Sequence, residues 1–180
     1  MLKKILGIAP KLESDGSFSP SKLALKLGTV NKTDYEKISY TKYQGKKSKI
    51  LVIFTEQKNL KMKNGKLFST GNHPVEALLP MLHLKNAGFE FEIATPTGKP
   101  VVFEMWAFPE KDEHVKAIYN EHKSNFEKPS KLQDFVDNSL TDSASYAAVF
   151  VPGGHGAMLG IPEDKNVGKI LNWAHQNDLF

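Results

Sequence analysis

Residues 146–164 read YAAVFVPGGHGAMLGIPED, and this stretch decides the fold. Tyr146 to Val151 is a short apolar run with β-branched and aromatic members, long enough for one buried parallel strand. The segment PGGHG (152–156) breaks the run, and its three glycines allow positive φ and leave amide N–H groups free to face a ligand. Because ligands of open α/β sheets bind beyond the carboxyl ends of the strands, the turn predicts an anion- or oxyanion-binding site.

Further apolar patterns precede and follow this strand. Lys49 to Phe54 reads as a buried strand, and Phe89 to Ala94 alternates as another. A helix is predicted between them, with His73 as cap, Pro74 at the first helical position and Gly88 at its end. Three more helices are expected at 111–126, at 130–140 with a serine cap at its first residue, and at 162–177. This alternation predicts a parallel sheet with helices packed against it.

The same patterns divide the chain in two. Residues 1–48 are rich in Lys, Ser, Gly and Thr without a sustained period, and we expect an extension with little regular structure that packs on the core. Residues 49–180 carry the α/β pattern. Leu179-Phe180 looks like the opening of another strand, so we expect these residues to be the front part of a longer domain whose remainder is missing.

Composition limits the functions to be considered. The 24 basic and 20 acidic residues leave a slight formal excess of +4, which favours a solvated surface over a specific nucleic-acid patch. The absence of cysteine excludes a disulfide framework and thiol chemistry within these residues. No apolar run approaches the roughly 20 residues that span a bilayer, so no membrane association is expected. The start MLKKILGIAP lacks the apolar core of a signal peptide, and a cytoplasmic location follows by default.

Three features could carry chemistry. Glu76 lies near a helix N-terminus, where a carboxylate at the border of the apolar stripe could transfer protons; the alternative is a capping box with His73. Gly153 and Gly154 could bind an oxyanion, or could simply make a tight connection between strand and helix. His155 would be presented beside the crevice by this turn, whereas the other histidines are more typical of surface or hydrogen-bonded positions.

Three segments together look like the HchA subfamily of the ThiJ/PfpI superfamily, the heat-shock chaperone and glyoxalase III proteins related to class I glutamine amidotransferases. The segments are GKLFSTGNHPVEALLPMLHLKNAGFEFEIAT (65–95), FEMWAFPEKDEHV (103–115) and YAAVFVPGGHGAMLGIPED (146–164). The resemblance runs from about Lys49 to Phe180. It implies a flavodoxin-like sandwich whose nucleophilic cysteine, partner histidine and supporting acid lie beyond Phe180.

The resemblance also implies a reaction, the glutathione-independent conversion of methylglyoxal to lactate, with glyoxal as a related substrate. Glu76 falls where the family has the glutamate that contacts the thiol and shuttles protons, and Gly153 and Gly154 fall where backbone amides form the oxyanion hole, with His155 beside them. No cofactor is required. Implied partners are glycated or unfolded protein clients and a second subunit in a homodimer.

The family's metal site, two histidines and a carboxylate, matches only in part. Glu90 and His122 align with two ligands, but Lys85 occupies the position of the first histidine, and His83 would point about 160° away from it on a helix. An ammonium would repel a divalent metal such as zinc and could pair with Glu90. We therefore expect a weakened zinc site or a salt bridge in its place.

Two other functions remain open. A holding chaperone would need only an exposed apolar surface, which we expect around Met105, Trp106 and Phe108 in a loop at 97–109. A catalytically inactive domain that binds small molecules would need only the fold. Because these 180 residues contain no cysteine, we expect the chain to be inactive by itself. We also expect a hydrophobic sheet edge that favours aggregation.

Overall fold

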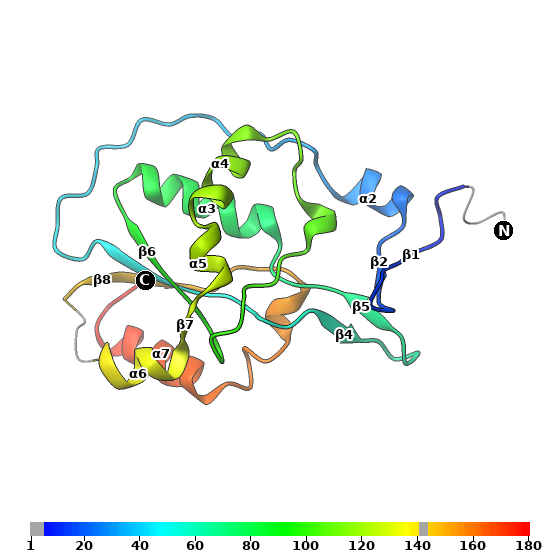
Figure 1. Cartoon of the computed structure of the whole chain (residues 1–180). Helices are drawn as coiled ribbons and strands as arrows, with labels where there is room; N and C mark the ends of the chain where they lie inside the picture. Colours follow the sequence, from blue (N-terminus) through cyan, green and yellow to red (C-terminus); the bar gives the residue numbers. More distant parts are fainter. Residues whose placement is uncertain (1–5, 141–143) are drawn as a thin grey trace.

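The computed structural model describes residues 6–140 and 144–180 and contains a central parallel sheet between two layers of helices (Figure 1). The sheet has the strand order β7-β6-β3-β8, and every neighbouring pair is parallel. Its strands are β3 (Lys49–Ile53), β6 (Glu90–Thr95), β7 (Ser130–Lys131) and β8 (Tyr146–Phe150). The predicted α/β fold class is confirmed.

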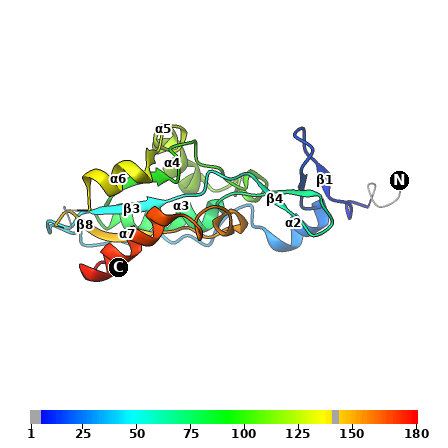
Figure 2. The same ribbon diagram turned by 90° about the horizontal axis from the view of Figure 1, so that it is seen from below.

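The helices cover the sheet on both faces (Figures 1 and 2). One face packs on α3 (Pro74–Asn86), α4 (Glu113–Glu121) and α5 (Lys123–Glu127), and the other on α6 (Leu132–Asn138) and α7 (Lys165–Gln176). Strand β3 lies between the layers, and its residues 50–53 are all buried, with alternate side chains in the two core clusters. A strand covered on both faces needs a continuous apolar run, which is what the sequence supplies there.

Three helix boundaries differ from the prediction. Ser130 does not cap a helix: it pairs with Ala94 in β7, and the helix begins at Leu132. The final helix begins at Lys165, because the Asp164 side chain accepts the amide hydrogens of the next turn. The charged helix predicted over 111–126 is two helices, α4 and α5, which meet at His122. In the first two cases local pairing or capping overrides the apolar period.

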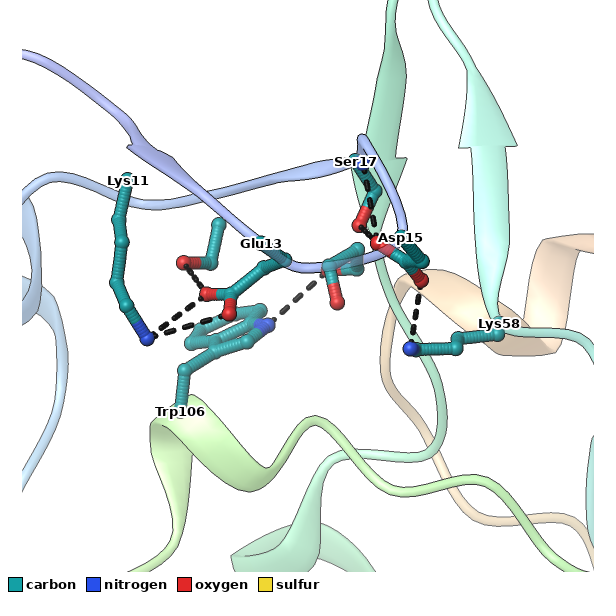
Figure 3. A network of polar contacts seen from close by, with 8 residues as sticks. Lys11, Glu13, Asp15, Ser17, Lys58 and Trp106 are labelled. Carbon is teal, nitrogen blue, oxygen red and sulfur yellow. Dashed lines mark hydrogen bonds and ion pairs between the residues drawn. The ribbon is translucent and has the colours of Figure 1, made fainter.

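A second, smaller sheet lies at the end of the molecule where the N-terminus is drawn (Figure 1). Its order is β1-β2-β5-β4, formed by β1 (Lys11–Leu12), β2 (Phe18–Ser19), β4 (Asn59–Lys61) and β5 (Leu67–Ser69). Asp15 pairs with Lys58 at 2.6 Å and accepts from Ser17, which ties the extension to the β4–β5 hairpin (Figure 3). The extension therefore has more regular structure than predicted, because two-residue strands carry no detectable period.

The rest of the extension consists of α2 (Lys22–Gly28) and an irregular segment that crosses α3 and α4 (Figure 1). The backbone amide of Thr33 donates to Asp112, and the Tyr35 ring lies 5.1 Å from the His83 ring and 4.7 Å from the His114 ring. No helix in the described ranges is long and apolar enough to cross a membrane.

The last described residue pairs with the outer edge of β8. The amide of Phe180 donates to the carbonyl of Ala147 at 3.1 Å, and the amide of Val149 donates to the carbonyl of Phe180 at 2.7 Å. This alternation is the bonding pattern of parallel strands. Phe180 therefore makes two bonds of the parallel type beside β8, although residues 179–180 form no strand in the structure.

Candidate functional site

The segment Gly71–His73 lies between the carboxyl ends of β3 and β8, where α3 begins. Asn72 is fully buried, and its side-chain amide donates to the carbonyls of Thr55 and Val102, while its side-chain oxygen accepts from the Thr55 amide. The His73 amide donates to the Gly153 carbonyl at 2.9 Å. These bonds place the start of α3 directly against the glycine turn.

Glycine is needed at the turn because two pieces of backbone approach closely. Gly154 has φ of 115°, and a Cβ there would lie 2.4 Å from the His73 nitrogen and 2.7 Å from the Gly71 oxygen. A Cβ on Gly156 would lie 2.6 Å from the Gly71 carbonyl carbon. Positive φ and steric contact thus both select glycine. The turn is thus packed directly against the segment that begins α3.

Glu76 lies at this turn. A Cβ built on Gly153 would be 1.9 Å from Glu76 Oε2, so the carboxylate occupies the space that the glycine leaves open. The alternative role of Glu76 in a capping box does not hold, because the His73 amide bonds to Gly153 instead of the carboxylate. His73 does cap α3 as predicted, through Nδ1, which accepts the Glu76 amide at 3.4 Å. Within the described chain the Glu76 carboxylate accepts no hydrogen bond. Its Oε1 lies 3.8 Å from His73 Nδ1, and its side chain is 58% exposed.

The amides of Gly153 and Gly154 have no hydrogen-bond acceptor among the described residues. Their carbonyls, by contrast, accept from His73 and Ala157. Gly154 lines a cavity together with His73, Glu76, Glu104, His155 and Met158. Unpaired backbone N–H groups beside a cavity can bind an oxyanion if the bound atom replaces water.

His155 begins the short helix η2 (His155–Met158) and faces the same cavity with a half-exposed ring. Its Nδ1 lies 2.8 Å from Oε1 of Glu104, and its amide donates to the same oxygen at 3.2 Å. Phe68 and Trp106 pack against the imidazole. Glu104, which precedes the short helix η1 (Met105–Ala107), has a fully buried side chain.

An adjoining hollow of about 340 Å³ extends this site toward the extension. Its walls include His73, Glu76 and His155 on one side and residues 20–29 around α2 on the other. The sequence patterns indicated neither Glu104 nor the residues around α2 as part of the site. Glu104 has one local signal, since it is a lone carboxylate within the apolar run FEMWAF (103–108). The residues around α2 have none, because α2 reaches the site only through the pairing of the extension with the second sheet.

The residues expected at a metal site share one pocket at the other end of α3. Lys85, Glu90 and His122 line it, but the Lys85 ammonium pairs with Glu121, not with Glu90 as predicted. The Nε2 atom of His122 is buried and has no hydrogen-bond partner, and burial lowers the pKa of this ring. One orphaned nitrogen beside an ammonium does not suit a divalent ion, and the described residues include no cluster of three His, Asp or Glu that could hold one. No step is therefore derived through a metal.

The sequence was compared with known proteins. It is 49% identical over 169 residues to the protein/nucleic acid deglycase HchA from several strains of Escherichia coli. The match spans 94% of this chain and 59% of those proteins. Over the aligned residues, this chain is similar to the HchA deglycases. The resemblance inferred from the three sequence segments is thus confirmed, although no protein-family model matches the chain.

Solved structures agree on the fold. The Rapid Encystment Protein 24 kDa of Francisella tularensis superposes with a TM-score of 0.57 at 17% identity, covering 72% of this chain and 55% of that protein. Glyoxalase III from Candida albicans gives 0.54 at 24% identity, covering 71% and 52%. The chain thus spans a little over half the length of the relatives and neighbours that it matches.

Proposed function

We propose that the gene product is a glutathione-independent glyoxalase that converts methylglyoxal to lactate, with a related deglycase activity on glycated proteins. The nucleophile would be a cysteine in sequence that follows Phe180, on a strand beside β8. Phe180 already pairs in parallel with β8, so a continuing strand would run toward the carboxyl edge where Gly153 and Glu76 lie. Without that thiol, the 180 residues would be inactive.

One observation carries the proposal: the Glu76 carboxylate is packed against Gly153, beside two unpaired backbone amides. A carboxylate that accepts no hydrogen bond within the described chain is available as a base. Amide donors at the same place can stabilise a negative oxygen, an effect that can be worth about 3 kcal/mol per donor. Acid–base and oxyanion functions are thus adjacent, as a carbonyl reaction requires.

The reaction would take three steps. The thiolate attacks the aldehyde carbon of methylglyoxal, and the carbonyl oxygen, held by the Gly153 and Gly154 amides, takes up the proton that the thiol has lost, which gives a hemithioacetal. Glu76 removes the proton from this carbon and returns it to the neighbouring carbon through an enediolate, while the hydroxyl proton passes to the neighbouring oxygen, which leaves a thioester. Water then releases lactate and restores the thiol. No cofactor or metal takes part.

Intact mass measurement and sequencing of the natural gene product test the first requirement, a cysteine beyond Phe180. Lactate production from methylglyoxal tests the second. Glu76→Gln should lower turnover at least about 100-fold without affecting folding, because it removes the base but keeps the shape. Glu113→Gln, an exposed carboxylate in the first turn of α4, is the matched control. Lactate formation by Glu76→Gln at the unmodified rate would contradict the role of Glu76.

A holding chaperone remains the second candidate, because apolar side chains are exposed on the extension: Leu6, Ile8, Leu12, Leu23, Leu27 and Val30. The surface predicted around residues 105–108 is smaller than expected, since Phe108 is buried and Trp106 donates to the Ser69 carbonyl (Figure 3). In the proposed homodimer this extension would bind unfolded clients. Glu76→Gln should leave suppression of client aggregation intact. A gene product without a cysteine would instead favour the chaperone or an inactive binding domain.

A further inference from the structure

Glu104 is a carboxylate that the proposed chemistry does not use. Its side chain is fully buried at the floor of the cavity, and Oε1 receives three donors: the Thr70 hydroxyl at 2.8 Å, the His155 amide at 3.2 Å and His155 Nδ1 at 2.8 Å. Its Oε2 is buried without a hydrogen-bond partner in the described chain. Burying a carboxylate costs free energy. Because two of the three bonds to this buried carboxylate come from His155, we look for its role in how it holds that residue.

This geometry determines which nitrogen of His155 can exchange a proton. Because a carboxylate oxygen only accepts, Nδ1 must be the donor in the 2.8 Å contact and carries its hydrogen in the neutral ring as well as in the charged one. The other ring nitrogen, Nε2, has no partner among the described residues, although the half-exposed ring lines the cavity. Nε2 is therefore the atom of His155 that is left for a ligand.

We infer that His155 Nε2 is a second oxygen-binding group for a vicinal dicarbonyl substrate, and that Glu104 is the positioning residue that holds it there. The inference rests on the proposed function and deepens it. A 1,2-dicarbonyl presents two neighbouring oxygens, and both gain negative charge in turn as an enediolate forms. The Gly153 and Gly154 amides can bind one of them. His155 can donate to the other from Nε2 when its ring is charged, because the charged ring carries a hydrogen on both nitrogens and Glu104 holds the one on Nδ1.

The packing around the ring supports this assignment. Phe68 and Trp106 restrict the imidazole, with ring centroids 5.2 Å and 6.4 Å away. The other titratable groups that line the two hollows are His73 and Glu76 at the start of α3, and the α2 wall contributes none. A substrate between Glu76 and His155 would thus meet a base on one side and, on the other, the Nε2–H of a charged imidazole ring.

The test is a double-mutant cycle on lactate production from methylglyoxal by the full gene product. His155→Asn can keep a donor to Glu104 but lacks Nε2, and should lower kcat about 100-fold with a much smaller change in KM. Glu104→Gln should lower kcat roughly tenfold. Because Glu104 acts through His155, the double variant should lose no more than His155→Asn alone. Losses that multiply, or wild-type turnover in His155→Asn, would overturn the inference.

A second measurement is independent of catalysis. Nitrogen-15 NMR of histidine-labelled protein should find neutral His155 as a single tautomer protonated at Nδ1, and Glu104→Gln should give a mixture. Thr70→Val removes the other side-chain donor to Oε1 and should lower stability without changing the tautomer. An unchanged tautomer in Glu104→Gln would disprove the positioning role. If the unmodified protein makes no lactate, the proposed function fails, while the NMR result still decides the role of Glu104.

Discussion

The two ends of α3 carry two clusters of ionisable side chains that are built differently. At its start, backbone bonds, glycines in close contact and the buried Asn72 side chain fix the backbone that carries Glu76, and the buried Glu104 side chain holds the His155 ring. At its end, Lys85 and Glu121 form an ion pair whose two side chains are each nearly half exposed. The first cluster is positioned by the fold, while the second is positioned mainly by its own charges. Substitutions should therefore be costly at the first end and mild at the second.

The largest effect is expected for Gly154→Ala. The new methyl group would meet the backbone of His73 and Gly71 at a residue whose φ is 115°, so neither a rotamer change nor a small shift relieves the contact. Left-handed backbone strain and overpacking together should lower the free energy of unfolding by about 3 kcal/mol or more. Gly168→Ala is the control, because nothing lies within 4 Å of it on α7, and it should stabilise by up to about 1 kcal/mol. Unfolding in denaturant measures the free energy of unfolding of both variants. Equal values for Gly154→Ala and Gly168→Ala would refute the close contact at Gly154.

Asn72→Ala should follow in size. The substitution leaves the buried Thr55 amide without an acceptor, and the carbonyls of Thr55 and Val102 lose their side-chain donor but keep a backbone donor each. The unpaired amide and the two lost bonds together should cost about 2–3 kcal/mol in unfolding free energy. Asn138→Ala removes one exposed bond at the end of α6 and should cost under about 0.5 kcal/mol. Similar losses in the two variants would mean that Asn72 does not join β3 to the site.

The contrast also explains what the sequence could predict. Three predicted features depend only on residues that are close together in sequence, and the structure has all of them: the strand before the glycine turn, the turn itself and the His73 cap. The bond between Glu104 and His155 joins residues 51 apart, and no local period records it. The cap-like position of Ser130 is a local signal that predicts a helix, whereas its pairing with β6 is not local. The sequence suggests Glu90 as a partner for Lys85, yet the partner is Glu121, which comes from α4.

At the second end of α3, the pH dependence of stability should reveal His122. Burial lowers the pKa of its ring, and Lys85 adds to this while Glu121 opposes it. The unfolded chain therefore binds more protons than the folded one below about pH 6.5, and stability should fall as the pH drops through that value. Carboxyls with lowered pKa values, such as Glu56 and Asp112, lose their contribution only in a more acidic range. His122→Gln should show a smaller loss between pH 7.5 and 5.5 in denaturant titrations; an equal loss would place the titrating group elsewhere.

Lys85→Ala should have the smallest effect. Its ammonium and the Glu121 carboxylate are 40% and 46% exposed, so water and salt screen the pair, and its loss should change the free energy of unfolding by less than about 0.5 kcal/mol. The same variant removes a repulsion that lowers the pKa of His122, so it should also reduce the acid sensitivity described above. Unfolding at low and at 1 M salt, each at pH 7.5 and 5.5, separates the two effects. A loss above about 1 kcal/mol that persists in high salt would show that this end of α3 is as firmly built as the other.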